Sequence, residues 1–251
     1  METSHGGKKM QGKTIFIVGG GGHIGKAIGR EFVKNGGNVT FFSRTQSKLE
    51  DAVRGLHVEQ AVDHTHIFAG DALKPEDLER ALTETKARFG GVDAVVLSAG
   101  GWTLNSRKSS DADSLNAAED HFRDFFLIPF ISGRVALKFF EEQGHGMLLN
   151  MSSHAALNPK LEGNDTYGPM KAAAHLLMTR WRWEEMEKGS GILIGNLTPM
   201  IVNTPDTASV LPTPEMKAKA VQPRDIGRWV VDHIDDKSLQ ESTPFNCDVV
   251  V

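Results

Sequence analysis

The segment IFIVGGGGHIGKAIGREF, residues 15–32, places four consecutive glycines between a short apolar run and an amphipathic stretch. Gly20, Gly22 and Gly25 fit the pattern G-x-G-x-x-G, and Gly19 begins the looser pattern G-x-x-G-x-x-G. Glycine permits a sharp turn and lets backbone N–H groups approach a pyrophosphate, and the N-terminus of a following helix adds partial positive charge. A merely flexible glycine tract is the alternative. The strand before and the helix after favour a βαβ unit that binds a nucleotide.

Short apolar runs alternate with amphipathic stretches along the whole chain. Strands are predicted at 14–18, 38–42, 66–69, 92–97, 146–150 and 192–197 and near 245–250. Helices are predicted from the glycines to residue 34 and at 46–54, 75–88, 115–142, 169–188 and 223–234, with a proline-punctuated loop at 199–214. Helices between strands imply right-handed crossovers and a parallel sheet covered on both faces. The pattern predicts an α/β fold, a single doubly wound Rossmann-like domain with about seven parallel strands, which binds ligands beyond their carboxyl ends.

Length and charge narrow the class of protein further. The chain has 251 residues, a length that α/β folds often fill with one domain. We predict a disordered lead-in at residues 1–12, without the apolar stretch of a signal peptide, and one dinucleotide-binding catalytic domain at 13–251. The net charge of −4 argues against a nucleic-acid partner, and no apolar run approaches the about 18 residues of a membrane span. The single cysteine and the spacing of the histidines predict no metal site. A cytoplasmic enzyme is therefore expected.

The end of the second predicted strand reads FFSRTQSKLE and should select the cofactor. NAD-binding proteins place an acid here for the ribose 2′-hydroxyl, whereas NADP-binding proteins accommodate the 2′-phosphate with a basic group. No acid precedes Glu50, while Ser43, Arg44 and Thr45 offer a guanidinium and two hydroxyls suited to a phosphate. We therefore expect NADP(H), although Arg44 could also be an ordinary loop arginine. Asp71, after the third strand, could accept a hydrogen bond from the adenine amino group or serve only its own turn.

Tyr167 and Lys171 are four residues apart near the start of a predicted helix, so both side chains project from one face. A free phenol has a pKa of about 10, and a nearby ammonium lowers that pKa by stabilising the phenolate. The pair is thus suited to donate a proton to a carbonyl, although any helix can carry such a pair on a solvated face. Ser152 and Ser153 lie at the carboxyl end of the fifth strand, where a hydroxyl could hold the same oxygen.

Together these features resemble the short-chain dehydrogenase/reductase family over nearly the whole chain. That family is NAD(P)-dependent and mostly interconverts alcohols and ketones. The resemblance implies that Tyr167 is the general acid/base and that Lys171 lowers its pKa and holds the nicotinamide ribose. It also implies that Ser153, rather than Ser152, orients the substrate oxygen. The cofactor-binding residues expected from the motifs and the resemblance are Gly19, Gly22, His23, Ile24, Gly25, Ser43, Arg44, Asp71, Ala72, Ala99, Gly100, Tyr167, Lys171 and Thr204.

The chain departs from the family pattern at several positions. The usual Asn-Asn-Ala-Gly after the fourth strand reads Leu-Ser-Ala-Gly at 97–100, and the usual Pro-Gly after the sixth reads Pro-Met at 199–200. The asparagine that completes the family's catalytic tetrad aligns with Phe125. Phenylalanine offers no hydrogen bond to the water that links the lysine to bulk solvent. We therefore expect another polar group, Ser98 or Asn150, to supply the proton relay; a simple core role for Phe125 is the alternative.

Three functions fit these residues. The first is an NADPH-dependent oxidoreductase that interconverts a ketone and a secondary alcohol, with Tyr167 as general acid. The second is a non-redox or coupled biosynthetic enzyme, for dehydration, isomerisation or cyclisation, which the missing asparagines and Met200 suggest. The third is an NADPH-binding regulatory protein, against which the Tyr167–Lys171 pair argues. The apolar run at 122–131, with the family's habit of pairing its long helices, predicts a homodimer or homotetramer.

Overall fold

The computed structural model describes residues 9–56, 62–101, 111–158, 166–234, 236 and 246–247. Within these residues the chain forms a seven-stranded sheet of order β3-β2-β1-β4-β5-β6-β7, in which every neighbouring pair is parallel. The predicted α/β, doubly wound architecture is therefore confirmed. The strands are β1 (Thr14–Val18), β2 (Asn38–Ser43), β3 (Thr65–Ala69), β4 (Ala94–Leu97), β5 (Gly146–Met151), β6 (Ile192–Leu197) and β7 (Asn246–Cys247).

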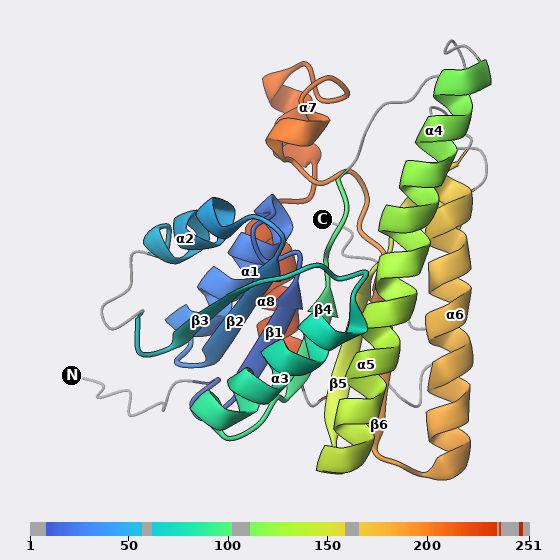
Figure 1. Ribbon diagram of the computed structural model, residues 1–251. Coiled ribbons are helices and arrows are strands. Elements are labelled where there is room, and N and C mark those ends of the chain that lie inside the picture. Colours follow the sequence, from blue (N-terminus) through green and yellow to red (C-terminus); the bar gives the residue numbers. More distant parts are fainter. Residues whose placement is uncertain are drawn as a thin grey trace.

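Helices cover both faces of the sheet (Figure 1). They are α1 (His23–Lys34), α2 (Gln46–Arg54), α3 (Pro75–Phe89), α4 (Asp111–Phe122), α5 (Ile128–Gln143), α6 (Tyr167–Lys188), α7 (Pro214–Lys219) and α8 (Pro223–His233). Helices α1 and α8 pack together on one face, whereas α3, α5 and α6 lie on the other. Among these described helices, none combines the length and the apolar character that crossing a bilayer requires.

Strand β1 shows why the central strands are apolar throughout. Ile15 and Ile17 enter the core on the side of α1 and α8, whereas Phe16 and Val18 enter the core on the side of α3 and α5. All four side chains are at most 1% exposed. Because both faces are covered, β1 has no polar alternation, and its carboxyl end delivers the glycine turn to the edge where ligands bind.

The helix predicted at 115–142 is interrupted. A π-helical turn at Arg123–Leu127 separates α4 from α5, and Pro129 follows in the first turn of α5. Proline has no backbone N–H and cannot donate to the carbonyl four residues earlier, so the hydrogen-bond ladder must shift at this point. The π-turn carries Phe125, and turns of this kind are frequent at functional sites.

Other boundaries also differ from the sequence prediction. Residues 9–12, expected to belong to a disordered lead-in, form a turn in which Met10 is 3% exposed and donates its N–H to the Asn35 carbonyl (2.9 Å). Strand β4 begins at 94 rather than 92, and only 246–247 of the last predicted strand belong to the described residues. Helix α7 was not predicted, although Thr213 caps it by accepting a hydrogen bond from the Met216 N–H (3.2 Å).

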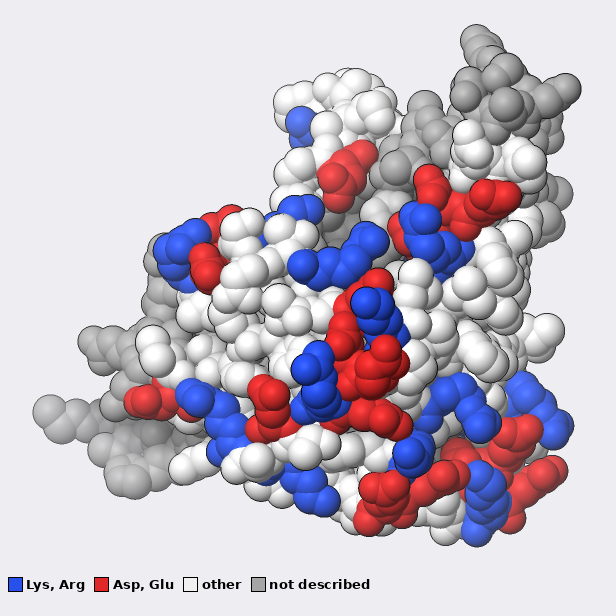
Figure 2. Space-filling model, in the orientation of Figure 1, with Lys and Arg blue, Asp and Glu red and all other residues white. Residues whose placement is uncertain are grey.

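Acidic and basic side chains interleave over α3 and the adjoining ends of α5 and α6 on the face drawn in Figure 2. Lys138 pairs with Glu79 (3.1 Å) and Lys188 with Glu141 (3.0 Å) across neighbouring helices. Exposed pairs of this kind contribute little stability.

Candidate active site

A cleft of about 1700 Å³ lies at the carboxyl ends of the strands. The glycine turn, the ends of β2 and β5, the π-turn, the start of α6 and the segment after β6 all contribute to its walls. The structure brings nearly all of the predicted site residues together here. Those that line the cleft are Gly19, Gly22, His23, Ile24, Ser43, Arg44, Asp71, Ala72, Ala99, Gly100, Ser153, Tyr167, Lys171 and Thr204.

The glycine turn is built so that backbone, not side chains, faces the cleft. Gly19 has φ +87°, and a Cβ there would lie 2.5 Å from the Ala99 nitrogen. Gly25, the one predicted residue that is not part of the cleft wall, lies beneath the turn, where a Cβ would lie 2.5 Å from the Gly19 carbonyl oxygen. Helix α1 begins here without a side-chain cap. Its first N–H groups and their partial positive charge are thus available to an anion.

The end of β2 offers a polar and basic wall. The Ser43 hydroxyl oxygen is buried and has no hydrogen-bond partner among the described residues. Arg44 is exposed beside it, and Lys48 of α2 also lines the cleft. The sequence prediction did not include Lys48, although it stands in the same segment; its place on the cleft depends on how α2 folds back. A buried hydroxyl beside two cations suits a phosphate.

Asp71 serves its own turn. Its carboxylate accepts a hydrogen bond from the Leu73 N–H (3.1 Å), and its own N–H donates to the Asp77 carboxylate (2.9 Å). The hydrogen bond from Asp71 is the main cause that lowers the pKa of Asp77. Asp71 also lines the cleft, so the predicted hydrogen bond to an adenine amino group is compatible with its role in the turn.

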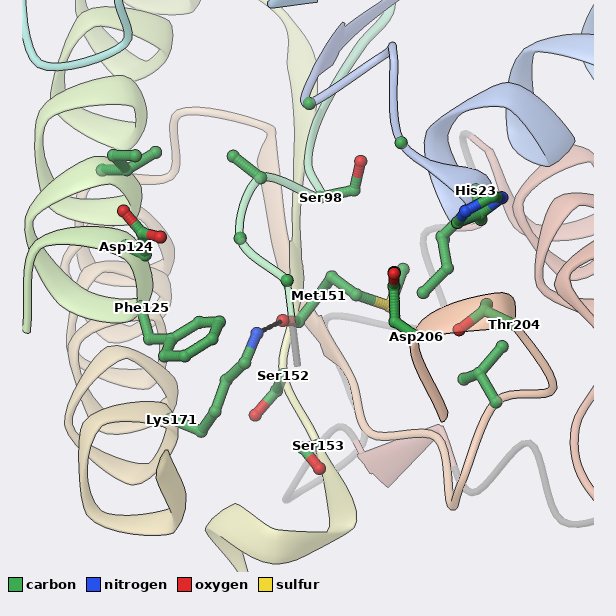
Figure 3. A pocket seen from close by; sticks show the side chains of 18 of the residues that line it. His23, Ser98, Asp124, Phe125, Met151, Ser152, Ser153, Lys171, Thr204 and Asp206 are labelled. Atoms are coloured by element: carbon green, nitrogen blue, oxygen red, sulfur yellow. Dashed lines mark hydrogen bonds between the residues drawn. The ribbon is translucent and has the colours of Figure 1, made fainter. Parts of the chain in front are cut away.

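Lys171 is buried in the wall of the cleft, at 7% exposure (Figure 3). Its ammonium donates a hydrogen bond to the Met151 carbonyl (2.6 Å) and lies 4.8 Å from the centroid of the Phe125 ring. Burial lowers the pKa of Lys171 to about 8. A cation on the face of an aromatic ring is stabilised electrostatically, which partly offsets this loss of hydration.

Tyr167 differs from the sequence expectation. Burial raises the pKa of its phenol, and a hydrogen bond with Ser153 acts in the opposite direction. Lys171 was expected to lower this pKa, but its ammonium lies 5.9 Å from the centre of the tyrosine ring and is directed to the Met151 carbonyl. In this arrangement Ser153, rather than Lys171, therefore favours the phenolate.

Phe125, which the sequence prediction aligned with the tetrad asparagine, is a core residue that also lines the cleft. Its side chain is 2% exposed, and its ring meets that of Tyr167 edge-on at a centroid distance of 4.9 Å. A Cβ on Gly100 would lie 2.6 Å from the Phe125 ring, so the chain after β4 must carry glycine here. These contacts show the core role of Phe125, whereas its correspondence with the tetrad asparagine stays a prediction.

The two groups proposed for the proton relay are engaged elsewhere. The Ser98 hydroxyl donates to the Val18 carbonyl (3.1 Å), and the Asn150 amide donates to the side-chain oxygen of Asn196 (2.9 Å). Both hydrogen bonds join neighbouring strands. Thr204 caps the short turn Pro205–Thr207, and its hydroxyl lies 3.4 Å from that of Thr207. The turn that follows Thr204 therefore fixes the position of this residue in the wall of the cleft.

Residues 13–215 match the model of a protein family described as short chain dehydrogenase. The chain belongs to this family. An uncharacterized oxidoreductase of Staphylococcus aureus (strain MRSA252) is 26% identical over 219 residues, which cover 87% of this chain and 89% of that protein. L-fucose dehydrogenase of Mus musculus is 36% identical over 92 residues, covering 37% of this chain and 32% of that protein.

Two solved structures share the fold. Levodione reductase has a TM-score of 0.78 at 19% identity, covering 96% of this chain and 97% of its own. A short-chain type dehydrogenase/reductase from Mycobacterium ulcerans has a TM-score of 0.77 at 21% identity, covering 95% of this chain and 89% of its own. At these identities the likeness shows the architecture of the short-chain dehydrogenases.

Short-chain dehydrogenases are oxidoreductases that bind NAD or NADP and act on small molecules. The cleft fits such a cofactor on two observations. The glycine turn leaves a backbone cradle that side chains at Gly19 and Gly25 would obstruct. At the end of β2, the enclosed Ser43 hydroxyl has no protein partner within the described residues. When bound, the nicotinamide supplies or accepts the hydride.

Proposed function

We propose that the protein is an NADP(H)-dependent oxidoreductase that interconverts a ketone and a secondary alcohol. The observation that carries this proposal is the cluster of Tyr167, Ser153 and Lys171 in one wall of the cleft. The phenol and a serine hydroxyl that are hydrogen-bonded to each other can both reach one substrate oxygen.

Each member of the cluster has a distinct role in this reaction. Because burial raises its pKa, Tyr167 stays protonated at neutral pH and donates its proton to the carbonyl oxygen as the alkoxide develops. Ser153 orients that oxygen by hydrogen bonding. Lys171 places a positive charge beside the phenol ring, held by the Met151 carbonyl, and would hold the ribose of the cofactor.

The reaction is tested by mixing the protein and NADPH with a panel of ketones and following nicotinamide absorbance, with NADP⁺ and alcohols for the reverse direction. Consumption of NADPH with formation of the alcohol supports the proposal. Conversion of a compound without any change in nicotinamide absorbance would support the non-redox alternative.

We also propose that residues 13–251 act as one catalytic domain. The cytoplasmic location of the protein stays a prediction.

Replacing Arg44 with alanine is expected to weaken NADPH binding about tenfold or more and to change NADH binding little. A charge-assisted hydrogen bond to a phosphate contributes roughly 1.5–3 kcal/mol, and NADH has no 2′-phosphate. Lys48→Ala should act in the same direction, since Lys48 lines the same wall. The affinities are measured by adding NADPH or NADH to the protein and following its tryptophan fluorescence.

The control for these variants is Arg180→Ala. Arg180 is exposed on α6, pairs with Glu184 (2.9 Å), and is not part of the cleft wall. Its replacement should leave both affinities unchanged. Equal affinities of the wild-type protein for NADPH and NADH would rule out the proposed role of Arg44.

We further propose that the protein is a homo-oligomer, as members of the family usually are. Rings at Phe122, Phe126 and Phe130 stack in a row along α4, the π-turn and α5. Phe130 is 39% exposed, and on the neighbouring α6 Leu176 and Trp183 are 69% and 48% exposed. An apolar surface formed by two adjacent long helices suits a second copy of the same surface.

Phe130→Glu combined with Trp183→Glu is expected to convert the oligomer into monomers, because a buried, unpaired carboxylate strongly disfavours an interface. Molar mass is measured by light scattering after size-exclusion chromatography. Val62→Glu is the control. Val62 is 72% exposed and precedes β3, which is the edge strand farthest from β6 and β7 in the sheet. A wild-type protein that is monomeric at high concentration would contradict the proposal.

A further inference from the structure

The Phe125 ring contacts both side chains of α6 on which the proposed function depends. The Lys171 ammonium lies over this ring, 4.8 Å from its centroid, and the Tyr167 ring stands perpendicular to it at a centroid distance of 4.9 Å. Figure 3 shows the ammonium between the Phe125 ring and the end of β5, where the Met151 carbonyl accepts its hydrogen bond. One aromatic side chain is thus shared by the amine and the phenol.

The Phe125 ring is held in this orientation from several sides. His121 of α4 packs against it at a centroid distance of 5.2 Å, and a Cβ on Gly100 would lie 2.6 Å from it. His121 is itself anchored, because its Nδ1 lies 2.7 Å from the hydroxyl oxygen of Thr166, the residue before α6. The ring is 2% exposed, so it cannot turn its face away from the ammonium unless these neighbours move.

Within the part of the chain that the structure describes, no carboxylate forms an ion pair with Lys171. Asp124, which precedes Phe125 on the π-turn, pairs with Arg123 instead (3.2 Å). Burial lowers the pKa of His121 and of His175, so both imidazoles are neutral at neutral pH. The positive charge is therefore stabilised by a backbone carbonyl and by the face of an aromatic ring.

The aromatic character of residue 125 matters for this charge. A cation over the face of a ring is attracted by the ring quadrupole, and more strongly where water is excluded. An aliphatic side chain of similar size would also exclude water but would offer no such attraction, so it would disfavour the ammonium. The phenol of Tyr167 adds no negative charge at neutral pH, because burial raises its pKa.

We propose that Phe125 is a positioning residue whose ring keeps Lys171 in its charged form beside Tyr167. This inference rests on the proposed function, in which Tyr167 gives its proton to the substrate and becomes a phenolate. A positive charge near the phenol ring stabilises that phenolate. Phe125 acts on the reaction through Lys171, and the π-turn together with Gly100 gives the ring the place from which it does so.

The test measures the pKa of Lys171 in the full chain without cofactor, by NMR of ¹³C-labelled lysine side chains, and Lys171→Met assigns the signal. Phe125→Leu keeps the apolar bulk but has no ring. It should lower the pKa of Lys171 by about one unit, hence roughly tenfold in the ratio of ammonium to amine. Phe140→Leu is the matched control and should leave this pKa unchanged. Phe140 is equally buried, at 0% exposure, but packs on Gly146 at the other end of β5.

Mono-, di- and trifluorinated phenylalanine at position 125 separate the charge of the ring from its shape. Each fluorine draws electron density from the ring face while the packing is nearly kept, so the pKa of Lys171 should fall in steps along the series. A merely structural role predicts the opposite sign, because water that enters a loosened site raises this pKa toward 10.5. A pKa that does not fall along the fluorinated series overturns the proposal, whatever the leucine variant does.

The same series tests the consequence for the reaction. Single-turnover reduction is recorded against pH, and the pH at which the rate falls to half should move down with the pKa of Lys171. A pKa that falls while this pH stays constant would overturn the role of Phe125 in the reaction. The NMR titration needs neither cofactor nor substrate, so a wild-type protein that reduces no ketone would contradict the proposed function, whereas the titration alone decides whether the ring keeps Lys171 charged.

Discussion

Tyr167→Phe is expected to abolish ketone reduction while leaving NADPH affinity nearly unchanged. General acid catalysis contributes about 10²–10⁴-fold, and this variant removes only the hydroxyl that supplies the proton. The ring that packs edge-on against Phe125 at 4.9 Å stays, so the wall of the cleft should keep its shape. Single-turnover absorbance measurements give the chemical step, and a fluorescence titration gives the affinity.

An independent measurement follows the phenol itself. Tyr167 is the sole tyrosine of the chain, so phenolate absorbance during alkaline titration reports this group alone. The pKa should lie above the ordinary value of about 10 in the free protein, because burial raises it. Ser153→Ala should raise it further by removing the hydrogen bond that favours the phenolate. A Phe variant that reduces ketones at the wild-type rate would rule out Tyr167 as the proton donor.

The sheet could be predicted because its signal is local. The ranges predicted for β1 and β6 match the structure at both ends, since a buried parallel strand is a short, continuous apolar run. The π-turn at Arg123–Leu127 could not be predicted from a local sequence pattern in this way. Hydrophobic periodicity continues through it, and only Pro129 marked the place where the hydrogen-bond ladder must change.

In the candidate site, too, the residues in short local motifs could be predicted, whereas those that depend on the fold could not. Gly19, Tyr167 and Lys171 belong to short motifs, and the structure brings them to one cleft. The relay candidates Ser98 and Asn150 were chosen by their position at strand ends, but both face neighbouring strands. The position of a residue at the end of a predicted strand shows that it lies near the carboxyl ends of the strands. The direction in which its side chain points depends on how that strand pairs with its neighbours, which the sequence does not show.

Electrostatics required the folded structure. The sequence places Tyr167 and Lys171 on one helix face, from which a lowered phenol pKa follows if the ammonium faces the hydroxyl. Folding instead directs the ammonium to the Met151 carbonyl and buries both groups, which raises one pKa and lowers the other. Burial depends on residues such as Phe125 that are distant in sequence from both.

Lys171→Met is expected to abolish activity and to raise the free energy of unfolding at neutral pH by roughly 1–2 kcal/mol. The ammonium is buried, and its pKa falls from 10.5 to about 8 on folding. Such a shift corresponds to at most about 3 kcal/mol of destabilisation. The lost hydrogen bond to the Met151 carbonyl offsets part of this gain, by about 1 kcal/mol. Urea unfolding of both proteins at several pH values measures the difference.

The pH dependence of that difference distinguishes a buried charge from general repacking. Between pH 8 and 10.5 the unfolded chain keeps the lysine proton that the folded protein has released, so wild-type stability rises with pH across this window. The advantage of Lys171→Met should therefore be full below pH 8 and shrink toward 10.5. Lys34→Met, at an exposed position of α1, is the control and should show no such trend. A difference that stays constant across the window would mean that Lys171 is not desolvated. Since desolvation of Lys171 makes the amine able to exchange a proton near neutral pH, the same result would also weaken its role in the proposed reaction.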